Sequence, residues 1–289
     1  VTALGFTPDG QRLISGGADG VIRFWDAIGT PVGDPINAGN GPVTAILTKA
    51  DGSFVTANGN GTLQRWDTLG NPTGGPMTGH GDTVRDLAIA ADGETLVSAS
   101  ADGTVRLWNV DGSPKLEPLT GHTGPVTAIA TLPDGTLVSG GEDGTLRRWD
   151  ANGAPLGEPI SQPGPVADIA ISPDGSTLAV GDQTGTLQQF NADGTPQGDP
   201  IADIGGPVQT VHFSPDGEQI IVGTEDGAPQ IRDRAGQLIP NLGEPPAEDD
   251  GDTLADSNVD QILETLRRLP PQVWVIIPVI VLGLLLLGL

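Results

Sequence analysis

The chain has 289 residues, a formal net charge of −24, 13 basic against 37 acidic side chains, and no cysteine. Nucleic-acid binding needs Lys and Arg to neutralise phosphates, so this balance argues strongly against it and also disfavours docking on an anionic membrane surface. Without cysteine the chain can form neither disulfides nor Cys-based zinc sites.

One pattern recurs along the chain and is clearest from Thr120 to Asp150, TGHTGPVTAIATLPDGTLVSGGEDGTLRRWD. It contains a Gly-His pair and three apolar runs separated by turns with Asp-Gly pairs. Alternation with a period of two predicts β-strands, and Asp-Gly pairs predict tight turns because glycine tolerates positive φ. The segment is therefore predicted to form three short antiparallel strands.

In chain order, the first strands of these repeats are predicted to begin near Val1, Val43, Val84, Val126, Val166 and Val208. The third strands end at Trp25-Asp26, Trp66-Asp67, Trp108-Asn109 and Trp149-Asp150, and in weaker copies at Phe190-Asn191 and Ile231-Arg232-Asp233. Segments such as GTPVGDPI from Gly29 follow each third strand and predict an outer edge strand, where proline removes no needed donor. The spacing of about 41 or 42 residues is typical of four-stranded propeller blades.

These repeats resemble the WD-repeat β-propeller family, in particular its bacterial members, from Val1 to about Gly243. The resemblance implies an all-β fold, a WD-repeat β-propeller (residues 1–243) in which six four-stranded blades are visible. Seven blades in the intact protein is the alternative, because the family most often closes its ring with seven. The chain starts inside a first strand and stops within an apolar run. We therefore expect it to be a piece of a longer protein.

Blades of this family contain a hydrogen-bonded set formed by a His, a Ser or Thr, an Asp and the Trp. By resemblance, the third and fourth blades supply complete sets, His80, Ser98, Asp102 and Trp108, and His122, Ser139, Asp143 and Trp149. A catalytic triad is the competing interpretation, but the same set in successive blades, closed each time by Trp, favours a structural hydrogen-bond network. We predict no catalytic residues, no metal site, no cofactor and no enzymatic activity.

One face of the predicted propeller is built by the loops before the first strands and the turns between second and third strands. Its candidate partner-binding residues are Asp82, Arg85, Glu142 and Glu225. The acidity of this face favours a basic or polar peptide, although no aromatic cluster marks a pocket. His212 replaces small or apolar residues of the other copies and is interpreted as a packed or partly exposed strand residue.

The composition changes after Gly243. Residues 244–257 are predicted to be an acidic disordered linker, and residues 258–270 a short amphipathic helix that pairs with another chain or rests at the membrane interface. Residues 272–289 carry no charge and are predicted to form a transmembrane helix, since at about 1.5 Å per residue they reach roughly 27 Å. Arg267 and Arg268 precede this run and nothing basic follows, which predicts a single-pass membrane protein with the propeller on the cytoplasmic side.

Taken together, these features predict a membrane-tethered, non-catalytic scaffold for protein–protein interaction. Its partners would be other proteins or peptides and, through one C-terminal helix, the membrane, but not nucleic acid. The alternative is a sensory or regulatory propeller module of a larger signalling protein. An enzyme built on the propeller is disfavoured, because the sequence shows no nonrepeating cluster of acid–base residues.

Overall fold

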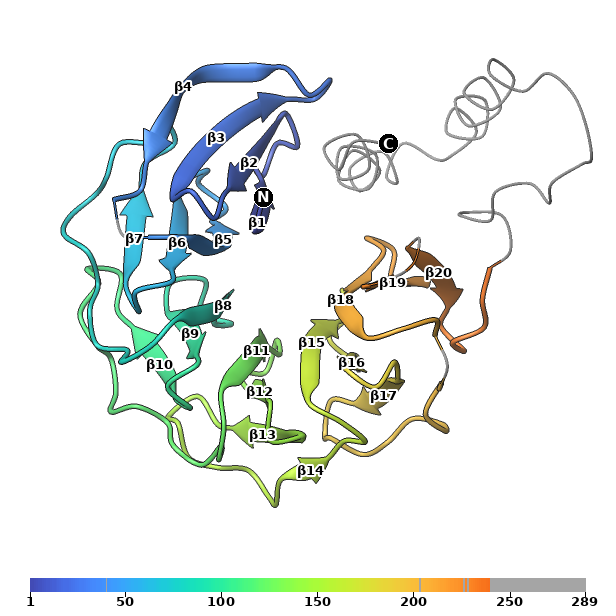
Figure 1. Cartoon of the computed structure of the whole chain (residues 1–289). Helices are drawn as coiled ribbons and strands as arrows, with labels where there is room; N and C mark the ends of the chain where they lie inside the picture. Colours follow the sequence, from blue (N-terminus) through green and yellow to red (C-terminus); the bar gives the residue numbers. More distant parts are fainter. Residues whose placement is uncertain (40, 203, 226, 228, 240–289) are drawn as a thin grey trace, which may run out of the picture.

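The computed structural model describes residues 1–239 except positions 40, 203, 226 and 228, and these residues form β-strands, turns and loops. The strands build six antiparallel sheets that follow one another in chain order, here called blades one to six (Figure 1). The predicted all-β architecture with six successive blades is confirmed by these sheets.

Each blade runs outward from an inner strand that faces the centre of the molecule (Figure 1). The inner strands are β1 (Ala3–Phe6), β5 (Val43–Thr48), β8 (Val84–Ile89), β11 (Val126–Thr131), β15 (Val166–Ile171) and β18 (Val208–Phe213). The second strands are β2 (Arg12–Gly16), β6 (Phe54–Asn58), β9 (Leu96–Ser100), β12 (Leu137–Gly141), β16 (Thr177–Asp182) and β19 (Gln219–Thr224). The third strands are β3 (Val21–Asp26), β7 (Leu63–Trp66), β10 (Val105–Trp108), β13 (Thr145–Trp149), β17 (Leu187–Asn191) and β20 (Gln230–Asp233).

Only two of the described blades have a fourth strand, β4 (Pro31–Asn37) in blade one and β14 (Ile160–Ser161) in blade four. The prediction of four full strands in every blade is therefore wrong. In blade two the outer segment meets β7 through isolated bridges, Leu63 to Met77 and Trp66 to Pro72. Proline supplies no ladder donor, and Gly74, at a φ of 79°, bends the segment away between the bridges.

The hydrophobic core lies between the blades. Because side chains alternate along a strand, each blade presents one apolar face to the preceding blade and the other to the next. Between blades three and four, for example, Val97 and Leu107 pack in one cluster with Val126, Ile129 and Trp149. Strands buried on both faces, such as β9 with the sequence LVSAS, need small or apolar residues at every position.

The turns after the third strands also pack against the preceding blade. Gly70 has a φ of +84°, and a Cβ atom there would lie 2.1 Å from Cδ1 of Ile36 and 3.2 Å from a ring carbon of Phe24. Glycine is thus required at this turn both for its conformation and for the close approach of two blades.

The six blades form an arc with the inner strands on its concave side, and β1 and β18 occupy the two ends (Figure 1). Consecutive inner strands pack against each other along the whole arc. Leu4 on β1 is 38 % exposed, whereas Leu87 and Ile129, which hold the same register position in blades three and four, are 7 % and 4 % exposed. Within the described ranges, the side of β1 that carries Leu4 is therefore less covered than the corresponding sides of β8 and β11. A seventh blade stays a prediction.

The predicted linker (244–257), amphipathic helix (258–270) and membrane span (272–289) lie outside the described residues. Among residues 1–239 without the four omitted positions, no helix has the length and apolar character needed to span a bilayer. The end of the propeller domain at residue 243 also falls beyond the last described residue, Ile239.

Candidate functional site

The four residues of the predicted hydrogen-bonded set of blade three lie together, with His80 in the loop before β8. Nδ1 of His80 lies 3.0 Å from Oδ2 of Asp102, and its Nε2 lies 2.7 Å from Oγ of Ser98. The indole Nε1 of Trp108 donates to the same Ser98 Oγ at 2.9 Å. One arrangement of protons satisfies all three contacts: Trp108 donates to Ser98, Ser98 to His80, and His80 to Asp102.

Blade four repeats this geometry. Nδ1 of His122 lies 3.1 Å from both carboxylate oxygens of Asp143, and its Nε2 lies 2.8 Å from Oγ of Ser139. Trp149 donates from Nε1 to Ser139 Oγ at 3.0 Å. The structure thus brings together the four residues of each predicted set, on the same elements of two successive blades.

Electrostatics keep the histidines neutral and the aspartates charged. Burial lowers the pKa of His80, against the opposing effect of Asp102, and burial lowers the pKa of His122 in the same way. Burial would raise the pKa of Asp102, but hydrogen bonds from Thr104, the Gly81 amide and His80 outweigh it and bring that pKa to about 2. The pKa of Asp143 is also about 2.

Two members of these networks were missed by the sequence analysis. Thr104 donates from Oγ1 to Asp102 at 2.6 Å, and Thr145 donates to Asp143 at 2.8 Å. Each threonine stands two residues after its aspartate, in the turn that leads into the third strand. The spacing Asp-Gly-Thr is visible in the sequence and is the signal that could have found them.

The serines of the two sets are poorly placed for nucleophilic catalysis. Ser98 and Ser139 are both fully buried, at 0 % exposure, and each hydroxyl already serves an indole and an imidazole. A nucleophile must be reachable by its substrate within hydrogen-bond distance. The arrangement instead fixes the Trp ring of the third strand against the second strand and ties the loop before the inner strand to the following turn.

The other blades keep parts of the set. In blades one and two, Trp25 donates to Ser15 at 2.8 Å and Trp66 donates to Thr56 at 3.0 Å. Blade five has Val180 in place of the serine. Its buried Asp182 instead joins the loop before the inner strand to the turn after the second strand. Asp182 accepts hydrogen bonds from the amide of Gly164 before β15 and from the turn after β16.

Blade six has an arginine where the other blades have an aromatic ring. Arg232 pairs with Ile220, as Trp108 pairs with Leu96 in blade three. It is 9 % exposed and donates to the carbonyl of Gly236 at 2.9 Å and to the amide oxygen of Gln230 at 2.7 Å. Burial lowers the pKa of its guanidinium. Neither of these bonding partners is charged.

Side chains of the inner strands join neighbouring blades across the boundary between them. In blades two and four a threonine does so: Thr44 Oγ1 donates to the carbonyl of Val84 at 2.5 Å, and Thr127 Oγ1 donates to that of Val166 at 2.7 Å. Thr2 makes the equivalent bond to Val43 in blade one. An alanine follows each of these threonines.

Blades three and five replace the threonine and alanine by Arg85-Asp86 and Ala167-Asp168. Here the aspartate makes the inter-blade bond, since Oδ2 of Asp86 accepts from the Ile129 amide at 2.8 Å. Oδ2 of Asp168 likewise accepts from the Val211 amide at 2.7 Å. We call these contacts, together with those of the threonines, the inter-blade bonds.

The predicted partner-binding residues lie on one face, called the upper face, formed by the loops before the inner strands and the turns after the second strands. Asp82 and Glu225 are exposed. Nη2 of Arg85 lies 3.4 Å from Oε1 of Glu142, an ion pair between blades three and four with both side chains about 40 % exposed. The pair partly cancels the charge of two of the four candidates, so the upper face is less acidic at this point than the sequence alone predicts.

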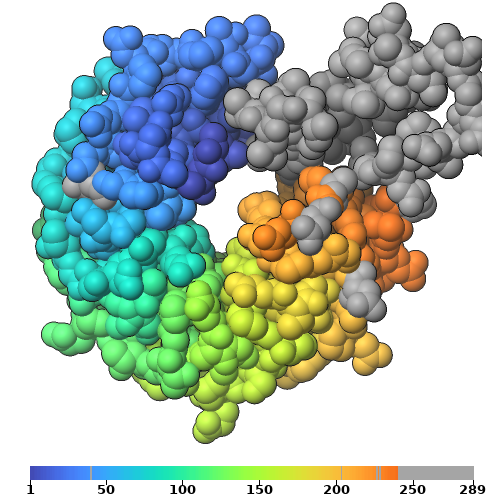
Figure 2. All heavy atoms as spheres, viewed as in Figure 1, coloured from blue at the N-terminus to red at the C-terminus, as the bar shows by residue number. Residues whose placement is uncertain are grey.

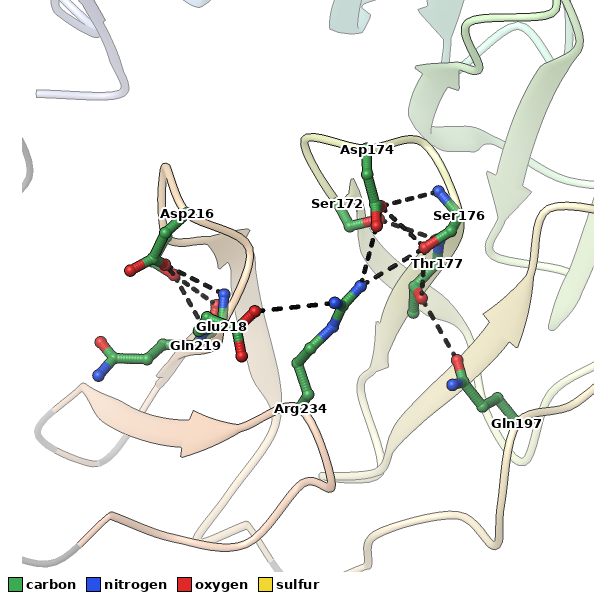
Figure 3. A network of polar contacts seen from close by, with 10 residues as sticks. Ser172, Asp174, Ser176, Thr177, Gln197, Asp216, Glu218, Gln219 and Arg234 are labelled. Atoms are coloured by element: carbon green, nitrogen blue, oxygen red, sulfur yellow. Dashed lines mark hydrogen bonds and ion pairs between the residues drawn. The ribbon is translucent and has the colours of Figure 1, made fainter.

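The opposite, lower face is formed by the turns after the inner strands and after the third strands. There Arg234 of blade six reaches Asp174 of blade five at 3.2 Å and Glu218 of its own blade at 3.9 Å (Figure 3). These side chains are 41 % to 66 % exposed, and exposed ion pairs of this kind contribute little to stability. This network aligns two turns and offers no reactive group.

His212 lies on β18 and is exposed, with Nε2 2.9 Å from Oγ1 of Thr210. Across the described ranges, no group of three or more His, Cys, Asp or Glu side chains is arranged to hold a metal ion. His212 is a strand residue, as expected, but it is exposed and not packed.

Among known protein families, the model of WD40, described as "WD domain, G-beta repeat", matches residues 1–26, 73–109, 113–150 and 198–231. No curated protein matches the chain. The matched segments include the complete sets of blades three and four. The chain therefore contains WD40 repeats, which supports the predicted place in the WD-repeat family.

Proposed function

We propose that this chain is a non-catalytic scaffold for protein–protein interaction, tethered to a membrane by its C-terminal segment. The observation that carries the proposal is the complete burial of Ser98 and Ser139 inside their networks. The polar groups that resemble catalytic machinery are used within the blades. WD40 domains generally bind other proteins, and the turns of the upper face are left to do so.

The partner surface in this proposal is the upper face around Asp82, Glu225 and the Arg85–Glu142 pair. Exposed carboxylates on neighbouring blades attract basic groups and steer their approach, although exposed charges add modest affinity. The lower face differs because its best-defined charged group, Arg234, already contacts two acidic side chains. A partner with a basic or polar peptide segment fits the upper face better.

The absence of native cysteine allows single cysteines to be placed for crosslinking. A photoreactive label at position 82 or 225 should give adducts of defined mass with a partner in source membranes. A label at Asp51, an exposed residue of the lower face, serves as the matched control. Equal adducts at all three positions, or none at positions 82 and 225, would contradict an upper-face partner site.

The membrane tether rests on the apolar, uncharged sequence of residues 272–289 and on Arg267 and Arg268 before it. In this arrangement the propeller lies on the cytoplasmic side. The full chain should remain in the membrane pellet after alkaline carbonate extraction, whereas a chain ending at residue 243 should be released. Release of both chains would remove the tether from the proposal.

The regulatory-module alternative places the same propeller within a larger signalling polypeptide. It predicts that the upper face contacts another domain of that polypeptide. The native polypeptide mass in source membranes separates the two ideas. A mass near 29.4 kDa supports the scaffold, and a much larger one supports the module.

A further inference from the structure

A cavity of about 390 Å³ opens on the concave side of the arc, between the inner strands of blades three to six. Its walls come from β8, β11, β15 and β18 and from the turns after β15 and β18. The space-filling view shows the hollow centre, which these blades border (Figure 2). The lining includes no member of the His–Ser–Asp sets and none of the four candidate residues of the upper face.

Departures from the repeat converge on this cavity. Asp86 and Asp168 line it, while the same register position in blades one, two and four is alanine: Ala3, Ala45 and Ala128. His212 also lines it, and the residue at its register position in blades three, four and five is again alanine: Ala88, Ala130 and Ala170. Polar residues thus replace alanine at three positions of the repeat, and all three line this cavity. This distinguishes the cavity from the rest of the concave side.

The electrostatics of the cavity favour a cation. Burial and the nearby charge of Asp168 raise the pKa of Asp86 to about 7, so the two carboxylates are costly to charge together. No Lys or Arg belongs to the lining, and the nearest basic residue in sequence, Arg85, pairs with Glu142. A positive group between the carboxylates would offset their repulsion.

The remaining lining indicates what kind of cation fits. Leu87, Ile169, Phe213, Pro173 and Pro215 give the cavity an apolar part beside its carboxylates and other polar groups. A divalent metal ion prefers several oxygen ligands, and the described residues hold no metal-binding group of three acidic or histidine side chains. An aliphatic chain that ends in an ammonium group matches both parts of the surface.

We propose that this cavity binds an alkylammonium group between Asp86 and Asp168, with its aliphatic chain against the apolar part of the lining. The group can come from a lysine side chain of the protein partner, in which case the site rests on the proposed scaffold function, or from a free aliphatic amine. His212 lines the site, and its Nε2 lies 2.9 Å from Oγ1 of Thr210, which donates to Asp168 at 3.1 Å.

The test titrates butylammonium chloride into the full chain in detergent at pH 8 and constant ionic strength, with saturation-transfer NMR as the readout. 1-Butanol, which has the same four-carbon chain without the charge, is the matched ligand control. We expect saturable binding of butylammonium and at least about tenfold weaker binding of 1-butanol. Equal binding of the two probes would overturn the proposal.

The variants must remove the carboxylates without removing the inter-blade bonds. The double replacements Arg85→Thr with Asp86→Ala and Ala167→Thr with Asp168→Ala install the threonine–alanine pair that blades two and four already use. This quadruple variant should unfold cooperatively like the parent protein and bind butylammonium at least about tenfold more weakly. Unchanged binding by the folded variant would overturn the assignment to these carboxylates.

A second arm distinguishes the two sources of the ammonium group. Acetyl-lysine-methylamide, whose side chain carries the charge, is compared with acetyl-norleucine-methylamide. Binding of the lysine compound assigns the site to a partner's side chain, and binding of butylammonium alone assigns it to free amines. Because these probes need no partner protein, a negative result here leaves the crosslinking test of the upper face independent.

Discussion

Oδ2 of Asp86 on β8 accepts a hydrogen bond of 2.8 Å from the backbone amide of Ile129 on β11. This bond crosses the boundary between blades three and four. At the boundary between blades four and five the polarity is reversed, since Thr127 donates to the carbonyl of Val166. Two kinds of hydrogen bond thus join neighbouring blades. A threonine–alanine pair on the inner strand gives a side-chain donor, and a pair that ends in aspartate gives a side-chain acceptor.

Replacing Asp86 by alanine should destabilise the protein. The Ile129 amide loses its acceptor, and an unsatisfied buried donor costs about 1–3 kcal/mol. Adding Arg85→Thr should restore part of that loss, because threonine can then donate to a carbonyl of the next blade, although the Ile129 amide stays without its acceptor. Urea unfolding at pH 5, where Asp86 is largely protonated, measures both effects. Equal midpoints for the single and double variants would contradict the exchange of one bond for the other.

The raised pKa of Asp86 predicts a pH dependence with a definite sign. The folded state holds the proton up to about pH 7, whereas the unfolded chain releases it near the ordinary aspartate pKa of 3.8. The free energy of unfolding contributed by this group is therefore largest below about pH 4 and falls as the pH rises towards 7. Relative to Asp86→Asn, the parent protein should lose stability over this window. A difference that stays constant with pH would contradict the shift.

Removing Ser98 tests the network of blade three. Ser98→Ala leaves His80 Nε2 and Trp108 Nε1 without their shared partner in a buried place, with an expected cost of about 1–3 kcal/mol. Ser113→Ala, at an exposed position just after a turn of the same blade, should change stability by less than about 0.5 kcal/mol. Thermal melting of both variants measures the difference, and similar midpoints would argue against the structural role.

Asp143→Ala should loosen blade four. It removes the acceptor of His122, of Thr145 and of the Thr123 amide. The expected result is a lower melting midpoint together with faster amide exchange in β12 and β13. An unchanged midpoint would count against the assignment of this aspartate to the network.

The blade architecture could be predicted from local patterns because each repeat carries its own strand and turn signals. The His, Ser, Asp and Trp members of the His80 and His122 networks could also be placed, through the family resemblance, because each set lies within one repeat, whereas Thr104 and Thr145 were missed. The inter-blade bonds could not, because Asp86 and Ile129 are 43 residues apart and neither belongs to a recognised motif. The weak pairing between the outer segments and the third strands was not predicted either, since proline and glycine are compatible with both an edge strand and a loop.

Blade six offers a test by repair. Arg232→Trp combined with Val222→Ser recreates the pair that joins Trp108 to Ser98, and it removes a buried charge from the face towards blade five. We expect the double variant to be more stable than the parent by about 1 kcal/mol or more, because burying a guanidinium costs desolvation energy. Urea unfolding measures this, and a loss of stability would show that Arg232 makes a contribution of its own.

Gly70, in the turn after β7, and Gly33, within β4, provide a matched pair of glycines with positive φ. Both have positive φ, 84° and 75°, but a Cβ would collide with Ile36 only at position 70, and nothing lies within 4 Å at position 33. Gly33→Ala should therefore cost about 1 kcal/mol from conformation alone, and Gly70→Ala clearly more. Equal losses in the free energy of unfolding for the two variants would mean that the turn at position 70 accommodates a Cβ atom without disturbing blade one.

Each inner strand makes its main inner-strand contacts with its chain neighbours along the described arc, so each boundary between blades can act as a separate joint. A rotation of a few degrees at one boundary moves all the blades that follow it. Rotations in the same direction at successive boundaries accumulate into a larger displacement between β1 and β18. Such an assembly is stiff within a blade and compliant along its length. Tension applied between its two ends would first widen the concave side, and with it the distance between Asp86 and Asp168, before any sheet lost a hydrogen bond.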